Sequence, residues 1–186
     1  MLTFIKMKKA LTKKIEIPSG VEAKLFGEKL IIKGPEGETS REFDFGKVSA
    51  KVEGSQIILS NVKATKNEKK RMNTIFSHIK NMVKGVQKKF EYKLKICYGH
   101  FPFTVRQDGK KIFIKNFLGE KVEREMTVPD GVDVEIKKEI ITIKSLDKEL
   151  AGQASANFET ATRIRGRDLR IFQDGIYITE KDGKKI

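Results

Sequence analysis

Apolar residues follow two kinds of spacing along the chain. Short runs rich in β-branched and aromatic residues, as at residues 30–33 and 112–115, are followed by turns and predict β-strands. Further short runs predict two hairpins: residues 48–52 with 56–59, and residues 132–136 with 140–143. Two longer segments instead place apolar residues at steps of three and four, which predicts helices with one apolar face. The pattern therefore predicts a β-rich chain with two helices.

The first predicted helix covers residues 68–89 and carries the clearest apolar stripe. That stripe comprises Met72, Ile75, Phe76, Ile79, Met82, Val83 and Val86. The second predicted helix, residues 148–165, is smaller, and its stripe comprises Leu150, Ala151, Ala154, Phe158, Ala161 and Ile164. Its alanines and Gly152 would allow a close approach to a sheet. We expect Gly166 to end this helix.

The chain also repeats itself. Residues 27–38 (GEKLIIKGPEGE) match residues 109–120 (GKKIFIKNFLGE) at an offset of 82. Three further matches keep the same order, at offsets of 81 to 84: Pro18 with Pro102, Ile57 with Ile141, and Gly85 with Gly166. Collinear matches of this kind indicate a duplicated unit.

The repeat and the element pattern together predict the architecture. We expect an α+β fold of two tandem homologous domains, each an antiparallel or mixed β-sheet with a helix packed on one face. The first domain would cover residues 1–89, including a basic N-terminal segment. The second would cover residues 90–186 and end in a C-terminal tail.

Charge points to the class of partner. The chain has 39 Lys and Arg against 25 Asp and Glu, a net charge of +14 and a pI near 9.7, which favours a polyanion. Nucleic acid and an anionic membrane surface are the two candidates. No apolar run reaches the ~20 residues that span a bilayer. The basic N-terminus lacks the apolar stretch of a signal peptide, so we expect a cytosolic start.

The residues able to carry catalysis are few. Cys97 is the single cysteine, and only His78 and His100 accompany it, which excludes a disulfide framework and a closed zinc site. Cys97 and His100 could form a thiol–histidine pair, but Cys97 ends an alternating segment in which small apolar packing is its ordinary role. No nucleotide-binding or hydrolase motif is present. We therefore expect neither an enzyme nor a cofactor.

Basic residues are unevenly placed. Residues 63–93 hold ten Lys or Arg and two Glu, and Lys69, Lys70 and Arg71 form the densest part. A solvated helix face explains this cluster as well as RNA contact does. Arg163, Arg165, Arg167 and Arg170, the arginine ridge, favour nucleic-acid contact, because a planar guanidinium suits phosphates.

Two further features bear on the ridge. The N-terminus of the second helix, near Lys148 and Gln153, could offer N–H groups to an anion. Ile171, Phe172 and the strand after residues 174–175 are expected to return to the core and hold the ridge in place. Without an RNA-stacking motif, a zinc finger or a helix-turn-helix pattern, the expected recognition is of nucleic-acid backbone and shape.

Three motifs carry a family resemblance: residues 78–103 (HIKNMVKGVQKKFEYKLKICYGHFPF), 114–121 (IKNFLGEK) and 167–181 (RDLRIFQDGIYITEK). They closely resemble the universal large-subunit ribosomal protein six family, called large-subunit protein nine in eukaryotes, and the eukaryotic or archaeal branch fits better than the bacterial one. The resemblance covers essentially the whole chain in order.

The resemblance implies a function. It implies two homologous domains bound to large-subunit ribosomal RNA near the sarcin–ricin loop and the translation-factor site, in the cytoplasm, beside neighbouring ribosomal proteins and with no membrane. It implies that the second domain makes most RNA contacts, at Asn116, Gly119 and Lys121, at Lys148 and Gln153, and along the arginine ridge. The alternative is a non-ribosomal basic protein that binds structured RNA or an anionic membrane surface.

Overall fold

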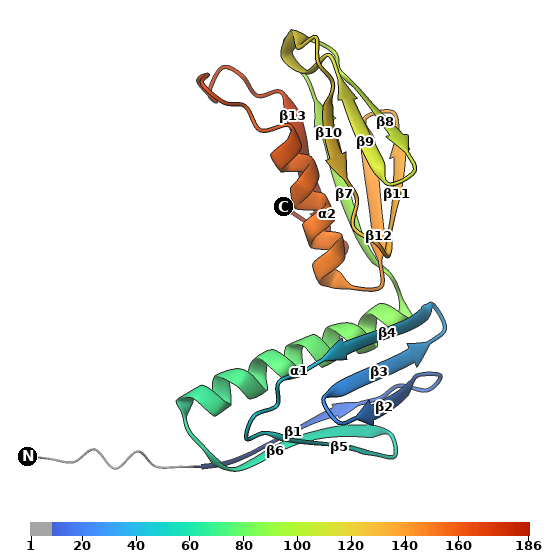
Figure 1. Cartoon of the computed structure of the whole chain (residues 1–186), viewed down its shortest axis with the longest axis vertical. Coiled ribbons are helices and arrows are strands. Elements are labelled where there is room, and N and C mark those ends of the chain that lie inside the picture. Colours follow the sequence, from blue (N-terminus) through green and yellow to red (C-terminus); the bar gives the residue numbers. More distant parts are fainter. Residues whose placement is uncertain (1–8) are drawn as a thin grey trace, which may run out of the picture. The chain divides into compact units, whose positions relative to one another are not determined.

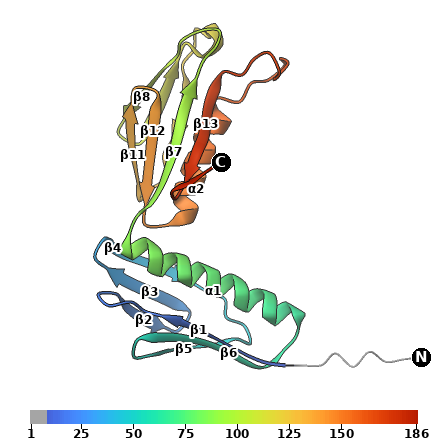
Figure 2. The ribbon, with the colours of Figure 1, turned by 180° about the vertical axis from the view of Figure 1, so that it is seen from behind.

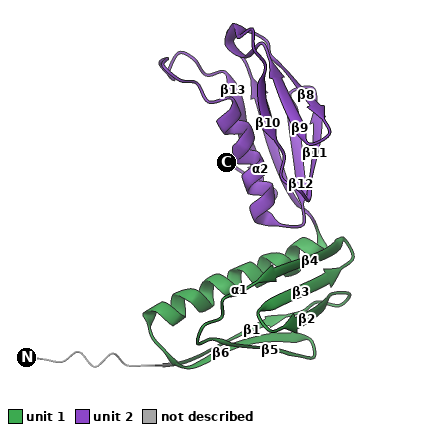
Figure 3. Ribbon diagram, viewed as in Figure 1, with its two compact units in different colours: residues 1–88 green, residues 89–186 purple. Residues whose placement is uncertain are grey.

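The computed structural model describes residues 9–186 of the chain. Contacts divide the chain into two compact units, with unit 1 ending at Lys88 and unit 2 beginning at Lys89 (Figure 3). Residues 1–8 of the predicted basic N-terminal segment lie outside the described residues.

In unit 1, residues 9–88 form two small antiparallel sheets and one helix (Figure 1). Strands β1, β6 and β5 form one sheet in the order β1-β6-β5, and strands β2, β3 and β4 form the other in sequence order. The bounds are β1 Lys9–Glu16, β2 Glu22–Phe26, β3 Lys29–Gly34, β4 Gly37–Glu42, β5 Ser49–Glu53, β6 Gln56–Ala64 and α1 Lys66–Gln87.

Unit 2 repeats this arrangement and extends one sheet. Strands β8 to β10 form a three-stranded sheet, and the larger sheet has the order β11-β12-β7-β13-β14. The bounds are β7 Phe90–Cys97, β8 Thr104–Asp108, β9 Lys111–Lys115, the 3-10 turn η1 Phe117–Gly119, β10 Arg124–Thr127, β11 Val132–Lys137, β12 Ile140–Ser145, α2 Lys148–Ala161, β13 Gly175–Lys181 and β14 Lys184–Lys185.

Strand register shows the duplication residue by residue. Ile15 of β1 lies opposite Ile57 of β6, and Leu94 of β7 lies opposite Ile141 of β12, so Ile57 and Ile141 occupy equivalent places. The N–H of Ile17 donates to the Ser55 carbonyl at 2.7 Å, and the N–H of Ile96 donates to the Glu139 carbonyl at 2.7 Å. The α+β fold with two homologous domains is confirmed, and each predicted sheet is divided into two.

Unit 2 differs from unit 1 by two insertions. Ile17 is followed at once by Pro18, whereas five residues, 97–101, separate its equivalent Ile96 from Pro102. The second insertion follows α2 and includes β13, which pairs with the free side of β7. Both insertions belong to unit 2, which carries the arginine ridge.

Helix α1 buries the predicted stripe. Met72, Ile75, Ile79, Met82, Val83 and Val86 are buried, and Phe76 packs half-buried against the same core. The helix begins after Thr65, whose N–H donates to the Glu68 carboxylate at 2.8 Å and so satisfies one of the free groups at the helix start. It contacts β3 and β4 of one sheet and β1 and β6 of the other, so one helix covers both sheets.

The structure corrects two expectations about α2. The helix ends at Ala161: Thr162, at φ −97° and ψ 11°, leaves the helical backbone, its hydroxyl accepts a hydrogen bond from the Ile176 N–H, and the chain then turns to bury Ile164. Gly166, at φ 69°, therefore lies beyond the helix, whereas Gly85 lies inside α1, so the two glycines are not equivalent ends. A Cβ at Gly152 would meet nothing within 4 Å, so Gly152 does not bring the helix close to the sheet.

We expect opposite effects from two glycine-to-alanine substitutions. A Cβ at Gly34 would lie 2.8 Å from the Val86 carbonyl oxygen and 2.9 Å from the Val86 side chain, so Gly34→Ala should displace the end of α1 and destabilise unit 1. Gly152→Ala should stabilise unit 2 by about 1 kcal/mol, because alanine is the better helix former. Urea unfolding followed by residue-specific hydrogen exchange measures both, and a stabilising Gly34→Ala would contradict the close packing.

Candidate nucleic-acid interface

The arginine ridge stands on the loop between α2 and β13. Arg163, Arg165, Arg167 and Arg170 are all exposed, and within residues 9–186 none of their guanidinium groups forms an ion pair. The four charges are therefore available to an external anion. We call residues 163–173 the arginine segment, and contacts at both of its ends hold it in place.

Arg124 of β10 holds the start of the arginine segment. Its Nη1 donates to the carbonyls of Ala161 at 2.8 Å and Arg163 at 3.2 Å, while Nε and Nη2 donate to the two carboxylate oxygens of Glu120 at 2.8 and 2.6 Å. The guanidinium also lies over the ring of Phe117, 4.3 Å from its centroid. One arginine thus caps the C-terminus of α2 and ties it to the turn that contains Phe117.

Thr162 closes the base of the same loop. Its hydroxyl is buried, donates to the Phe158 carbonyl at 3.1 Å and accepts the N–H of Ile176 at 3.0 Å. The residue that follows α2 is thereby bonded to the start of β13. The arginine segment is a loop whose two ends are fixed together.

Asp174 holds the far end of the arginine segment. Its carboxylate is almost fully buried and accepts the N–H groups of Gly99 at 2.7 Å and His100 at 3.0 Å, while His100 Nδ1 lies 2.6 Å from the second oxygen. The His100 ring stacks on Phe172 at 4.5 Å between centroids, and the Arg167 guanidinium lies 4.8 Å from the centroid of the same Phe172 ring. The carboxylate therefore positions an arginine of the ridge through two stacked rings.

Opposing effects act on the pKa of Asp174. Burial raises the pKa of this carboxyl, but the hydrogen bonds from the His100 backbone and side chain and from the Gly99 N–H outweigh burial and hold the pKa below its ordinary value of 3.8. A carboxyl whose pKa is depressed by folding stabilises the folded state above that value and loses this contribution as the pH falls. Asp174 is therefore a charged anchor at neutral pH.

Ridge arginines line one cleft, and a second cleft shares Glu120 with the first. One, of about 630 Å³, is lined by Leu118, Glu120, Arg124, Glu125, Thr160, Ala161, Arg163, Ile164, Arg165 and Arg167. The other, of about 460 Å³, is lined by Pro102, Thr104, Lys115, Asn116, Gly119, Glu120 and Lys121. Glu120 belongs to both, so the predicted loop at 116–121 and the ridge share one end of unit 2 (Figures 1 and 2).

The loop at 116–121 is longer and less regular than the tight turn at residues 34–37, its counterpart in the repeat. Asn116 and Leu118 have φ of 65° and 50°, and the chain forms the one-turn helix η1 before β10 begins at Arg124. Asn116 adopts this conformation while its side-chain amide donates to the Pro102 carbonyl at 3.0 Å. Lys121 is exposed at the end of the loop, beside the second cleft.

Three acidic residues near the ridge are paired with groups other than its arginines, while Asp168, within the arginine segment, accepts the backbone N–H of Arg170 at 2.9 Å. Glu120 is paired with Arg124, Glu125 with Lys111 at 2.8 Å, and Asp174 with His100. Hydrogen bonds from Arg124 lower the pKa of Glu120, burial opposes them, and the charges of Arg124 and Arg167 lower it further. Because these carboxylates are neutralised locally, the net field of the surface remains positive.

Lys148 and Gln153 lie apart from this surface. They belong to the N-terminal half of α2, and a helix of 14 residues extends about 20 Å, so Lys148 is at the opposite end from the ridge. The Asp147 carboxylate accepts the Glu149 N–H at 2.8 Å, which places a negative charge at the helix start. That carboxylate already uses one N–H of the helix start, and Gln153 bonds to Asn157 at 2.8 Å.

Lys69, Lys70 and Arg71 lie in unit 1, in the first turns of α1, and are exposed. Arg71 donates to the Asp44 carboxylate at 3.2 Å, and its guanidinium lies against Gly46. Both partners are largely exposed, so the pair contributes little stability. Arg71 is nonetheless partly occupied, in contrast to the ridge arginines.

The core contacts expected after the ridge are confirmed for Phe172 and β13 but not for Ile171. Ile171 is 64% exposed and does not return to the core, whereas Phe172 packs half-buried and Ile176 is fully buried, so the core contact begins one residue later than expected. Leu169 is also 64% exposed. The sequence did not single out Arg124. A spacing of four from Glu120 is a signal for an ion pair within a helix, but residues 120–124 are not helical, so the spacing alone did not predict this pair.

Other chemistry finds no support in the described part of the chain. His100 directs Nδ1 at Asp174, and Cys97 is a half-buried free thiol at the end of β7. Across residues 9–186, no group of three His, Cys, Asp or Glu side chains could hold a metal ion. Neither of the helices described there is long and apolar enough to cross a membrane.

The duplicated α+β fold and its exposed arginine loop define a basic protein of the kind found among ribosomal proteins. The model of one such family, ribosomal protein L6, matches residues 17–89 and 101–175, and the chain belongs to this family. Ribosomal proteins are structural components rather than enzymes, which confirms the expectation that the chain is not an enzyme.

Similar proteins occur in several archaea. The chain is 43% identical over 175 residues to large ribosomal subunit protein uL6 of Methanothrix thermoacetophila, covering 94% of this chain and 99% of that protein. It is 42% identical over 174 residues to uL6 of Methanococcus vannielii, covering 94% and 96%. For uL6 of Aeropyrum pernix the identity is 38% over 173 residues, covering 92% and 95%. The family resemblance and its archaeal branch are confirmed.

We expect Asp174→Asn to destabilise unit 2 by about 1–3 kcal/mol at pH 7, because an amide cannot accept the same three hydrogen bonds. The wild-type chain should lose stability as the pH falls below 3.8, and the variant should show a flatter dependence there. Urea unfolding between pH 7 and pH 2 measures both. Asp168→Asn, which changes an exposed carboxylate on the same loop, is the control and should cost less than about 1 kcal/mol; equal costs would contradict the anchoring role.

Arg124→Lys should loosen the arginine segment while preserving charge. A lysine cannot reach the Glu120 carboxylate and the Ala161 and Arg163 carbonyls together, so we expect a loss of about 1–2 kcal/mol and faster amide exchange at residues 163–173. Arg106→Lys is the matched control, because Arg106 is exposed and lies over Phe113 at 5.3 Å. Unchanged exchange in the segment would show that Arg124 does not hold it.

Proposed function

We propose that the chain is a structural constituent of the large ribosomal subunit and binds ribosomal RNA through the arginine ridge and the loop at 116–121. The observation that carries this proposal is the exposure of four arginines without ion-pair partners in residues 9–186, on a loop fixed at both ends. The names of the archaeal relatives support the assignment to the large subunit.

The chemistry of the ridge suits an RNA backbone. Each guanidinium offers planar paired donors that match phosphate oxygens, and a fixed loop loses little conformational freedom when it binds. Asn116, Gly119 and Lys121 extend the surface through the clefts that share Glu120. Lys148, Gln153, Lys69, Lys70 and Arg71 would be secondary contacts, because they lie on other parts of the two units.

The finer placement rests on the family resemblance. We propose that the bound RNA lies near the sarcin–ricin loop and the translation-factor site, so that translation factors pass nearby and other ribosomal proteins are neighbours. The protein would act in the cytoplasm within the assembled subunit. Its contribution would be to neutralise phosphates and fix the relative positions of RNA helices.

A membrane surface fits the structure less well. An amphipathic helix binds lipid with an apolar face that is free, but the apolar face of α1 is buried against both sheets of unit 1. The exposed apolar residues Leu169 and Ile171 stand singly among the ridge arginines. RNA therefore remains the better partner for the basic surface.

Replacing the four ridge arginines by alanine tests the proposal. The quadruple variant should fold normally and bind an RNA fragment containing the sarcin–ricin loop more weakly. The log–log salt dependence of binding should flatten by about three, since each phosphate that an arginine neutralises adds roughly 0.7–0.9 to that slope. Fluorescence anisotropy titrations at several salt concentrations provide the measurement.

A variant that removes the same charge elsewhere in unit 2 separates the ridge from bulk electrostatics. The matched control replaces four exposed lysines: Lys95, Lys137, Lys138 and Lys185. It should retain most of the salt slope. Equal losses in the two variants, or unchanged affinity of the ridge variant at every salt concentration, would sink the assignment.

A further inference from the structure

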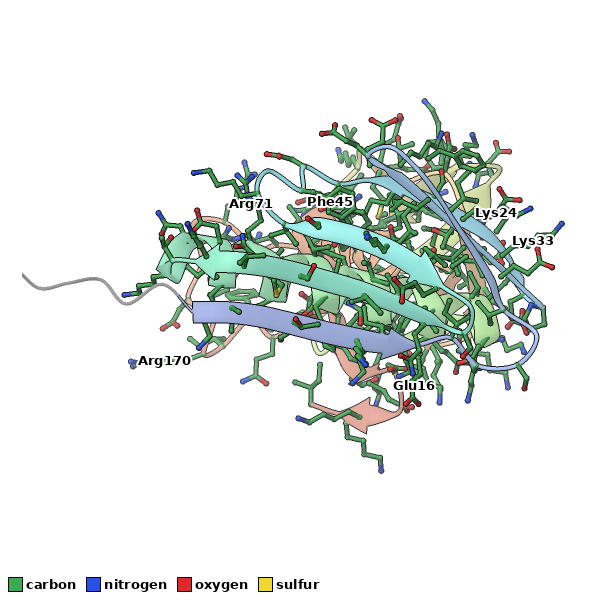
Figure 4. All side chains as sticks on the ribbon, turned by 90° about the horizontal axis from the view of Figure 1, so that it is seen from below. Glu16, Lys24, Lys33, Phe45, Arg71 and Arg170 are labelled. Atoms are coloured by element: carbon green, nitrogen blue, oxygen red, sulfur yellow. The ribbon has the colours of Figure 1, made fainter. Side chains whose placement is uncertain are left out.

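The equivalent strands β1 and β7 differ in how many neighbouring strands pair with them. In unit 2, β7 lies between β12 and β13 and is hydrogen-bonded on both sides (Figure 2). In unit 1 the equivalent strand, β1, is the last strand of its sheet, and among residues 9–186 only β6 pairs with it (Figure 4). The edge that β13 covers on β7 is therefore open on β1.

Strand register identifies the equivalent residues. Lys14 lies opposite Ile58 and Lys93 opposite Thr142, as Ile15 lies opposite Ile57 and Leu94 opposite Ile141. The N–H groups of Ile17 and Ile96 both point toward the hairpin partner. Since backbone groups alternate between the two edges of a strand, those of Thr12, Lys14 and Glu16 point to the open edge.

Strand β13, which pairs with β7, shows which side chains suit a strand that binds at this edge. Ile176 and Ile178 of β13 pack into the core of unit 2, and the Thr179 hydroxyl donates to the Lys93 carbonyl at 3.1 Å. Lys93 Nζ forms an ion pair with Glu180 at 3.1 Å. Strand β13 thus has apolar residues at alternate positions and a carboxylate, that of Glu180, which pairs with Lys93.

The edge of β1 carries features that oppose indiscriminate pairing. Lys13 faces inward at the place that Tyr92 occupies in unit 2, with its Nζ 4.4 Å from the ring centroid of Phe76. A register shift interrupts the ladder between Lys9 and Leu11. Inward lysines and bulges are devices that protect edge strands from aggregation, so a partner for this edge has to be complementary.

We propose that β1 is a docking edge for an extended segment of another protein, which adds an antiparallel strand where β13 lies in unit 2. The segment would carry apolar residues at alternate positions and a carboxylate opposite Lys14, the counterpart of the pair between Lys93 and Glu180. A second copy of this chain fits less well, because two antiparallel β1 strands would bring the Lys13 and Lys14 of both copies together. This inference does not depend on RNA binding by the ridge.

A peptide taken from unit 2 is the direct probe. The 12-residue segment 173–184 (QDGIYITEKDGK), acetylated and amidated, should bind the full-length protein more tightly than a scrambled peptide of the same composition. On binding, amide exchange should slow at Thr12, Lys14 and Glu16, whose N–H groups point to the open edge. NMR titration and hydrogen exchange measure the two effects.

Three variants, at Thr12 and Lys14, separate backbone pairing from charge. Thr12→Pro removes an outward N–H, which an edge strand tolerates, and should weaken binding roughly five-fold, as expected for one backbone hydrogen bond, while Thr12→Ala should not. Lys14→Glu should weaken binding roughly two- to five-fold, and a peptide with Glu180→Lys should restore it. Unfolding curves of all three variants check that unit 1 remains folded.

Several outcomes would overturn the proposal. Equal binding of the scrambled peptide, or no slowing of exchange in β1, would remove the docking edge. Faster exchange across β13 would show that the peptide had displaced it from β7 instead. Concentration-dependent dimerisation abolished by Thr12→Pro would make a second copy of the chain the occupant, and protection of β1 by RNA alone would make the edge part of the RNA surface.

Discussion

The basic surface of unit 2 depends on the hydrogen bonds between the buried Asp174 carboxylate and residues Gly99 and His100. The carboxylate accepts two backbone N–H groups and pairs with His100, and these bonds hold its pKa below the ordinary value although burial favours the neutral form. Through the stack of His100, Phe172 and Arg167, this anchor fixes the far end of a loop whose start is fixed by Arg124. The loop can therefore hold like charges close together, and Glu120 and Glu125 beside it are paired with Arg124 and Lys111 rather than with the ridge.

The same contact explains how two copies of one unit diverged. Residues 97–101 and the segment from 162 to β13 have no counterpart in unit 1, and Asp174 joins one to the other through Gly99 and His100. The two insertions thus form a single added layer that carries the ridge and covers the edge of β7. Within residues 9–88, unit 1 has neither the ridge nor the covering strand, and β1 remains open. The two units share one architecture, and the segments added at the edge of β7 give unit 2 a surface that unit 1 lacks.

Much of the fold followed from periodicity. The stripe of α1 was buried as predicted, and the repeat correctly paired β3 with β9 and the hairpins with each other, because alternation and steps of three and four report directly on which faces are apolar. The errors lie at the end of α2 and in the loop after it, where contacts between distant residues decide the structure. Helix α2 ends at Ala161, earlier than Gly166 suggested, where the Thr162 hydroxyl bonds the Ile176 N–H, and Ile171 is exposed although its apolar side chain indicated burial. Arg124 was overlooked because its partners, Ala161 and Arg163, lie more than thirty residues away.

The sequence by itself determined the duplicated α+β plan, the positive charge and the family, because apolar spacing, composition and motif identity are properties of the chain in order. Only the tertiary structure decided which basic groups are free. The arginines of the ridge differ from Arg124 and Arg71 in forming no ion pair with an acid of residues 9–186, and that difference depends on which distant segments the fold brings beside each guanidinium. It likewise decided that β1 is an open edge, since pairing on the second side of a strand is a long-range contact that local pattern does not encode.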